Sequence, residues 1–297
     1  WLDIMQQKYA SRNRTMPTSN QKQAMLPQGA ELVDNSTGTA CGFAIRHNRA
    51  TFFFTPGVPS ELKVMMNDEI LPRMRAKLGQ NGRSQVRRFF LFGLSESGLS
   101  DRLDNLTWPA GIALGYRANL PTIEMKLIID TEDNEAIERA EAQLLAEVGT
   151  HLVARNEMNF TKTLGPALAD KEVILFEEAS GGRLTDTIST IISDFEGHYI
   201  AGLPDSAEDL ARWLQKSARP SSLAIGAKGP QGIPIALNTH QACYAQTLQM
   251  HFRDSLAQRR LLAFAALDML RRYLEEETVM VDYDIMPCSE RFTTAVL

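Results

Sequence analysis

The residues best suited to chemistry lie in two short segments, each placed where an apolar run gives way to a helical pattern. The first segment is Pro56-Gly57-Val58-Pro59-Ser60-Glu61, which follows the aromatic run Phe52-Phe53-Phe54. Proline removes a strand donor, glycine permits a tight turn, and the free amides at a helix start attract anions. This segment predicts a phosphate-binding turn, with an ordinary strand–loop–helix junction as the alternative.

The second segment, Glu177-Glu178-Ala179-Ser180-Gly181-Gly182, precedes a helical pattern over residues 184–192. A serine and two glycines ahead of a helix suit a phosphate. The two acids suit a metal ion or an acid–base pair, but adjacent side chains in a turn point apart. Two capping or solvated acids are therefore the simpler interpretation of Glu177 and Glu178.

The first segment needs a strand before it and a helix after it. Residues 52–54 predict a short buried strand, and Ser60 is a suitable N-cap for the helix. Glu61 then lies in the first turn, where the helix dipole favours an acid. The helix is expected to bury one face at helical spacing, formed by Leu62, Met65, Met66, Ile70 and Leu71.

Metal chemistry has little support in these residues. The histidines, at positions 47, 151, 198, 240 and 251, show no H-x-x-x-H spacing, and the three cysteines form no C-x-x-C pair. Scattered thiols are typical of a reducing compartment, so we expect a cytoplasmic protein without a zinc site.

The composition predicts a globular protein of two or three domains. The chain has 297 residues, 44% hydrophobic and 23% charged, with a net charge of −5. This charge argues against a general nucleic-acid or membrane binder, and no apolar run approaches the ~20 residues of a membrane span. Because the first residue is Trp1, we expect a missing N-terminal segment.

Residues 85–155 predict a β-α-β-β-α-β order, the split βαβ arrangement. Its strands are expected over residues 86–92, 112–117, 122–129 and 151–154, and its helices over 98–106 and 134–148. The second helix is acidic and no G-x-x-G motif is present, which argues against a nucleic-acid partner.

Residues 156–276 alternate between strand and helix patterns, which predicts a sheet covered by helices. Strands are expected over residues 173–176, 199–202, 223–227, 233–237 and 244–252, and helices over 160–169, 184–192, 206–216 and 255–275. The tail, residues 277–297, has no clear period and is expected to be disordered or a docking arm.

Several motifs in order resemble the CinA (competence/damage-inducible protein A) family. They are N-Q-K-Q-A at residues 20–24, L-P-Q-G-A at 26–30, N-S-T-G-T-A-C-G-F at 35–43 and P-G-V-P-S-E at 56–61. Cys41 departs from the family pattern, which has proline there. The resemblance implies that residues 1–84 are the back half of a MoaB/MogA-like, molybdopterin-binding-type α/β domain.

The same resemblance implies a nucleotide- or anion-binding cleft in this half domain. Its expected lining comprises Lys22, Asn35, Gly38, Thr39, Gly57, Pro59, Ser60 and Glu61. For the complete family domain, the resemblance implies a metal-dependent pyrophosphatase that acts on ADP-ribose-like substrates. Its divalent metal would be held by the acids of a T-G-G-L-G-P-T-x-D-D loop, a motif that these 297 residues lack.

In the middle segment, G-L-S-E-S at residues 93–97 resembles the G-x-x-E-S with which the family's KH-like middle domain opens. The resemblance implies a structural spacer that helps to form a homodimer.

The last segment resembles the family's nicotinamide-nucleotide amidohydrolase domain, a three-layer α/β fold. That domain carries A-E-S-x-T-G-G, whose serine attacks the carboxamide of nicotinamide mononucleotide, and a Y-S/A-N-x-x-K segment, whose lysine is the base. Aligning the paired glycines places Glu178 at the serine and Ser180 at the threonine. The lysine segment falls near residues 202–207, yet no lysine occurs between Lys171 and Lys216.

A third family loop, T-G-x-A-G-P-x-G, is partly kept, with matches at Gly226, Gly229, Pro230 and Gly232. The resemblance thus implies a CinA-like protein of nucleotide metabolism whose amidohydrolase region is inactive. The Ser180-Gly181-Gly182 turn is the candidate for a retained nucleotide site. A non-catalytic nucleotide-binding scaffold or sensor is the alternative.

Overall fold

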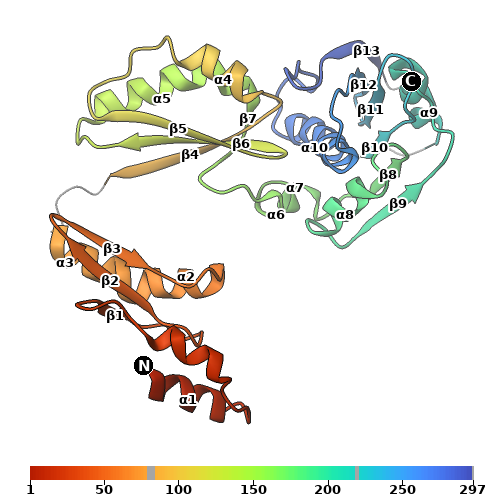
Figure 1. The fold of residues 1–297 in the computed structure, drawn as a ribbon. Coiled ribbons are helices and arrows are strands. Elements are labelled where there is room, and N and C mark those ends of the chain that lie inside the picture. Colours follow the sequence, from red (N-terminus) through yellow and green to blue (C-terminus); the bar gives the residue numbers. More distant parts are fainter. Residues whose placement is uncertain (79–83, 218–220, 296–297) are drawn as a thin grey trace. The chain divides into compact units, whose positions relative to one another are not determined.

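The computed structural model describes residues 1–78, 84–217 and 221–295, and these form two compact units, Trp1–Arg83 and Ser84–Leu297 (Figure 1). Strands and helices alternate in both units, which confirms the predicted α/β class. Within the described ranges, no helix combines the length and apolar character that a membrane span requires.

The first unit is a three-stranded antiparallel sheet with helices on one face. The strands β1 (Glu31–Val33), β2 (Gly42–His47) and β3 (Ala50–Phe54) pair in that order. The helix α2 (Pro59–Met65) continues through a π turn, η2 (Met66–Ile70), into α3 (Leu71–Leu78). The core of this unit consists of Val33, Ala44, Met65 and Ile70. Two further elements, α1 (Leu2–Ala10) and the 3₁₀ helix η1 (Thr18–Ala24), precede the sheet.

Residues 52–54 lie in the strand β3, as predicted, but the prediction that this strand is buried is wrong. Phe52 and Phe54 are 50% and 47% exposed, and only Phe53 packs against the core. Side chains of a strand alternate between two faces, and helices cover one face of this sheet. Phe54 instead stacks on Phe43 of the neighbouring strand, with ring centroids 4.7 Å apart.

The predicted start of α2 also needs correction. The helix begins at Pro59, Val58 is its N-cap, and no side chain caps it. Proline suits the first helical position because its fixed φ is helical and its missing N–H would be unpaired there. Ser60 therefore lies inside the helix. Leu62, expected on the buried face, is 37% exposed.

The second unit contains two sheets. The first has the strands β4 (Gln85–Phe92), β5 (Ile112–Asn119), β6 (Thr122–Ile129) and β7 (Leu152–Arg155), with α4 (Glu96–Leu103) and α5 (Asn134–Val148) between them. Its antiparallel order, β5-β6-β4-β7, is the split βαβ topology that the sequence predicts. Ser95 caps α4 by accepting a hydrogen bond from the Gly98 amide at 2.9 Å. The 3₁₀ turn η3 (Gly149–His151) leads into β7.

The other sheet of this unit has six strands in the order β13-β12-β11-β10-β8-β9. Its parallel part is β8 (Val173–Glu177), β9 (Phe195–Tyr199) and β10 (Ser222–Ile225), and its antiparallel part is β11 (Ile233–Asn238), β12 (Ala242–Leu248) and β13 (Cys288–Ala295). The helices α8 (Arg183–Ser189) and α10 (Ser255–Leu274) pack on one face, and α9 (Ala207–Ser217) packs on the other (Figure 1). The arrangement has three layers.

Two predictions for this region are corrected by the structure, and it decides between the two alternatives for the tail. The helix expected over residues 160–169 is two short helices, α6 (Phe160–Thr163) and α7 (Gly165–Leu168), and β9 ends at Tyr199, where the predicted strand begins. Within its described part the tail is not disordered, and it docks on the second unit, which is the second of the two expected alternatives. Tyr283 and Met286 are 1% and 0% exposed, and β13 pairs with β12 at the sheet edge. The tail shows no period before β13 because it packs there as an irregular segment.

Candidate functional site

Glu177 is the last residue of β8, and its carboxylate caps the start of α8 from inside the protein. The side chain is 1% exposed and accepts hydrogen bonds from the Leu184 amide at 3.1 Å and the Thr185 amide at 3.0 Å. The hydroxyls of Ser180, at 2.5 Å, and Thr185 also donate to it. An acid at this position is stabilised by the positive end of the helix dipole.

This cap changes what the Ser180-Gly181-Gly182 turn can offer a ligand. Ser180 is fully buried, and its hydroxyl faces Glu177. Gly181 and Gly182 adopt left-handed backbone conformations, φ +58° and +88°, that favour glycine. The first-turn amides that a phosphate would use already bind a carboxylate. An incoming phosphate would have to compete with Glu177 for them.

Glu178 turns away from Glu177 and binds a different loop. Its Oε2 accepts a hydrogen bond from the Leu203 amide at 2.8 Å, in the loop that follows β9. The two acids therefore point apart and cap separate backbone segments, as the turn predicts. Across the described ranges, no three His, Cys, Asp or Glu side chains form a group that could hold a metal ion.

Three loops meet at the carboxyl ends of the parallel strands, where ligands commonly bind in open α/β sheets. Besides the Glu178–Leu203 bond, the Ala227 amide donates to the Pro204 carbonyl at 3.2 Å. A Cβ at Gly226 would lie 2.2 Å from that carbonyl oxygen. The structure thus joins the turn at residues 177–182 to the loops at 202–206 and 226–232.

Two cations near these loops were not predicted from the sequence. Lys228 is the one lysine in the three loops, and its side chain is exposed. Arg259 of α10 packs over the turn, since a Cβ at Gly181 would lie 3.0 Å from its guanidinium carbon. No motif marks Arg259, because its contact depends on how α10 packs against the sheet.

In the first unit, the structure brings Asn35, Gly38 and Glu61 together. The Asn35 amide is buried and donates to Glu61 Oε2 at 2.8 Å, while its carbonyl oxygen accepts from the Gly38 amide at 2.9 Å. Gly38 has no room for a side chain, since a Cβ there would lie 2.2 Å from Glu61 Oε2. The loop at residues 35–40 is therefore fastened to the start of α2.

A lysine that the sequence did not single out completes this cluster. Lys8 of α1 donates to the Asn35 and Gly38 carbonyls at 2.6 and 2.8 Å. Trp1 donates its indole N–H to the Thr39 carbonyl at 2.9 Å. Lys22 is exposed, and its side chain forms no hydrogen bond or ion pair with the described residues. Gly57, Pro59 and Ser60 are exposed beside the cluster.

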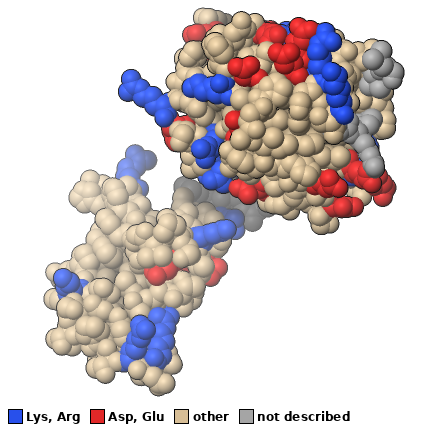
Figure 2. Space-filling view, turned by 90° about the vertical axis from the view of Figure 1, so that its right-hand side faces the viewer, with Lys and Arg blue, Asp and Glu red and all other residues tan. Residues whose placement is uncertain are grey.

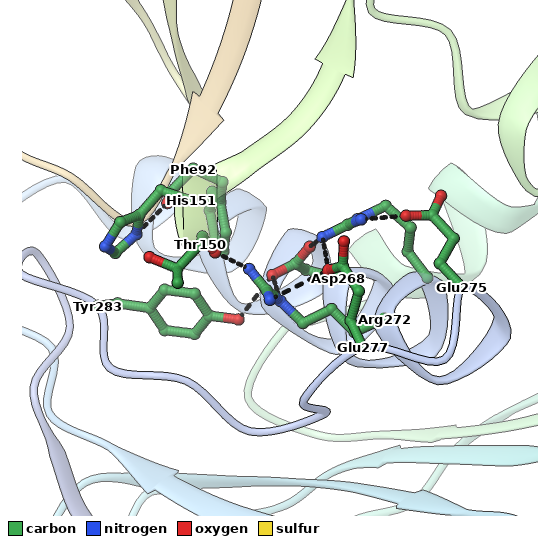
Figure 3. Close-up of polar contacts among 9 residues, drawn as sticks. Phe92, Thr150, His151, Asp268, Arg272, Glu275, Glu277 and Tyr283 are labelled. Atoms are coloured by element: carbon green, nitrogen blue, oxygen red, sulfur yellow. Dashed lines mark hydrogen bonds and ion pairs between the residues drawn. The ribbon is translucent and has the colours of Figure 1, made fainter. Parts of the chain in front are cut away.

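A buried ionic network links α10 to both the tail and the four-stranded sheet (Figure 3). Asp268 is fully buried and accepts hydrogen bonds from Arg271 and Arg272, each at 2.9 Å, and from the Tyr283 hydroxyl at 3.0 Å. Arg272 also donates to the Thr150 carbonyl, next to His151.

Burial and the nearby Asp268 raise the pKa of Tyr283 well above its usual range, so the phenol stays a donor. The pKa of the Arg271 guanidinium is raised, because its acidic partners outweigh the effect of burial. The network therefore holds its charges in place, and its groups serve packing between the two sheets.

On the face of the second unit seen in Figure 2, acidic and basic side chains occur side by side. This face carries no continuous basic surface.

No protein-family model matches the chain. It is 32% identical over 326 residues to a CinA-like protein of Shewanella loihica, covering 97% of this chain and 77% of that protein. It is 33% identical over 309 residues to CinA-like proteins of Shigella flexneri and Escherichia coli (strain K12 / DH10B), covering 100% of this chain and 76% of each.

Proposed function

The chain belongs to the family of CinA-like proteins, and from this premise we propose that it serves nucleotide metabolism of the NAD and ADP-ribose cycle without deamidating nicotinamide mononucleotide. In this proposal the C-terminal region keeps an amidohydrolase-like fold and has lost the catalytic pair. The loops that the resemblance assigns to substrate remain adjacent at one edge of the sheet.

The observation that carries the proposal is the hydrogen bond between Glu178 and Leu203, 2.8 Å long. By the family alignment, Glu178 stands at the nucleophile and Leu203 lies in the segment of the base. A carboxylate that fastens one segment to the other serves as a brace between them. It is also repelled by the negatively charged phosphate of the substrate.

Hydrolysis of an amide needs a nucleophile, a base to deprotonate it and donors for the oxyanion. Glu178 as nucleophile would have to form an anhydride and expel ammonia, which is uphill. Ser180 cannot take its place, because its hydroxyl is buried against Glu177. Loss of a nucleophile or its base alone costs about 10⁴ to 10⁶ in rate in serine hydrolases.

The test is ammonia release from nicotinamide mononucleotide by the purified chain. We expect none in the wild type or in Glu178→Ser, which restores a hydroxyl without a base. Lys228→Ala checks whether the exposed lysine of the third loop has taken over as base. A wild-type turnover of about 1 per second, within the range of working enzymes, would overturn the proposal.

For the first unit, the resemblance supports an ADP-ribose pyrophosphatase in the full-length protein, and a non-catalytic nucleotide-binding scaffold or sensor is the second candidate. The described residues offer no group of acids, histidines and cysteines that suits a divalent metal, so we derive no metal-dependent step. The hydrogen bond from Asn35 to Glu61 favours the scaffold, because it engages the one acid of the cluster. Release of AMP from ADP-ribose by the full-length protein separates the two candidates.

We also propose that residues 85–155 help to form a homodimer. Deleting them is a poor test, because Phe92 packs into the core of the six-stranded sheet, 4.5 Å from Phe264. The molar mass of the intact chain by light scattering decides whether it is a dimer. A monomer at all concentrations would refute the assembly.

A further inference from the structure

A cavity of about 540 Å³ lies in the second unit, and its lining includes Arg183, the residue that follows the Gly181-Gly182 turn. Its walls come from the β5–β6 turn, the start of α6, the outer side of α8 and the first half of α10. None of residues 177–182, 202–206 and 226–232 lines it. Its volume falls within the range of about 300 to 1,000 Å³ that is typical of small-molecule sites.

One side of the cavity is apolar and partly aromatic. Phe160 and Phe264 lie side by side there, with ring centroids 4.9 Å apart, and Met158 and Leu120 extend the wall. Leu120 is 49% exposed and Phe264 only 7%, so Leu120 and the half-buried Phe160 present most of the surface that a planar ring could cover.

Charge lies next to this wall, because Arg260 precedes Phe264 by one turn of α10. Arg260 lines the cavity and is exposed, and it forms no ion pair with any of residues 1–78, 84–217 and 221–295. Arg183 also lines it and is paired with Asp186 at 3.1 Å. These three side chains sum to one positive charge, and the Asp186 carboxylate can still accept hydrogen bonds.

The three threonine hydroxyls in the wall are poor hydrogen-bond donors for a ligand, because each already donates to a carbonyl. Thr187 and Thr190 donate to carbonyls of α8, both at 2.7 Å, and Thr161 donates to the Thr190 carbonyl at 3.0 Å. The protons of these three hydroxyls are therefore already used, and the two arginines are the charged donors that the lining offers an anion.

We propose that this cavity binds a nucleoside monophosphate. The base would lie on the wall of Phe160 and Phe264, the ribose hydroxyls would donate to Asp186, and the phosphate would meet Arg260. An anion without a ring would leave the apolar wall exposed, and a neutral aromatic molecule would leave Arg260 unpaired. The nucleotide matches all three surfaces, and its binding does not depend on whether the turn at residues 177–182 is active.

The test is isothermal titration calorimetry of the whole chain with AMP, adenosine, ribose 5-phosphate and inorganic phosphate. We expect AMP to bind at least tenfold more tightly than the other three, because each lacks the base or the phosphate. Arg260→Gln is expected to weaken AMP binding at least tenfold, about the loss of one hydrogen bond to a charged group. Phe160→Ala should weaken binding of AMP and leave ribose 5-phosphate unchanged.

Arg253→Gln is the matched control, since Arg253 lies just before the same helix, is also exposed and does not line the cavity. It should bind AMP as the wild type does. Equal losses in the two arginine variants, or inorganic phosphate binding as tightly as AMP, would overturn the proposal, and so would no AMP binding at millimolar concentration. Thermal denaturation establishes that each variant is folded. Ammonia release from nicotinamide mononucleotide is measured separately. A negative result for AMP binding therefore leaves the proposal of an inactive turn unaffected, and the converse also holds.

Discussion

The carboxylate of Glu178 and the backbone amide of Leu203 lie 2.8 Å apart, which fastens the end of β8 to the loop after β9. The hydrogen bonds of catalytic groups are often long or poorly aligned before substrate binds, whereas Glu178 already has a backbone partner at 2.8 Å. This difference makes stability measurements informative about function.

Glu178→Ala is expected to lower the free energy of unfolding by about 1 to 3 kcal/mol, because the Leu203 amide loses its acceptor. Urea denaturation measures the change, and Glu132→Ala, at an exposed position, is the control. A variant more stable than the wild type would identify Glu178 as a strained site residue and contradict its role as a brace.

Glu177→Ala should cost more than Glu178→Ala, because Glu177 accepts four hydrogen bonds while Glu178 accepts one from Leu203. Hydrogen bonds to charged groups contribute about 1.5 to 3 kcal/mol each, so a loss above about 3 kcal/mol is expected. Comparing the urea midpoints of the two variants checks the order. The reverse order would mean that α8 does not depend on this cap.

Tyr283→Phe is expected to destabilise the chain by about 1 to 3 kcal/mol, because Asp268 loses a buried donor. Asp268→Asn should cost about 3 to 5 kcal/mol, since it removes the buried negative charge that both arginines share. Calorimetric melting of both variants tests these values. Near-native melting of Asp268→Asn would show that the network adds little to stability.

His151 should make stability depend on pH. Burial lowers the pKa of its imidazole, outweighing the bond to the Phe92 carbonyl. The unfolded chain therefore binds a proton that the folded chain does not, beginning near the ordinary pKa of about 6.5. This contribution is complete above that pH and is lost as the pH falls below it.

The measurement is urea unfolding of the wild type and of His151→Gln at pH 7.5 and 5.5. The loss of stability at the lower pH should be smaller in the variant. His240→Gln, at an exposed position, controls for removal of a histidine. Identical losses in the wild type and His151→Gln would rule out this source of pH dependence.

The cluster around Asn35 is tested by calorimetry of ADP-ribose on the full-length protein. Ser60→Ala with Glu61→Ala is expected to weaken binding, because Glu61 orders the loop through Asn35 at 2.8 Å. Lys22→Ala asks whether this lysine belongs to the cleft, as the sequence predicts. Affinity equal to that of the wild type in the Ser60/Glu61 variant would end the idea of a ligand cleft at this turn.

Much of the fold could be predicted from local patterns. The helix Asn134–Val148 and the strand Thr122–Ile129 have the predicted bounds, because alternation and helical spacing are strong in both. The exposure of Phe52 could not be predicted, since an aromatic run does not tell which face of a sheet is covered. The sequence left open whether the tail is disordered or docked, because its burial depends on packing against distant elements.

The candidate site likewise contains features that could be predicted from the sequence and others that could not. Adjacent acids that point apart follow from turn geometry, and so the separate roles of Glu177 and Glu178 could be predicted. Lys8 and Arg259 could not, because each reaches its partner across the fold from a helix that carries no motif.

The close approach of Gly226 and Gly229 to the backbone of Pro204 and Asp205 bears on how such sequences are interpreted. Any side chain at Gly226 would collide with a carbonyl oxygen, so glycine is required there by sterics whether or not the protein turns over a substrate. A glycine motif of this kind can therefore be kept in a protein that lacks the catalytic activity. The glycines therefore indicate family membership, whereas catalytic activity has to be judged from the positions of the nucleophile and the base.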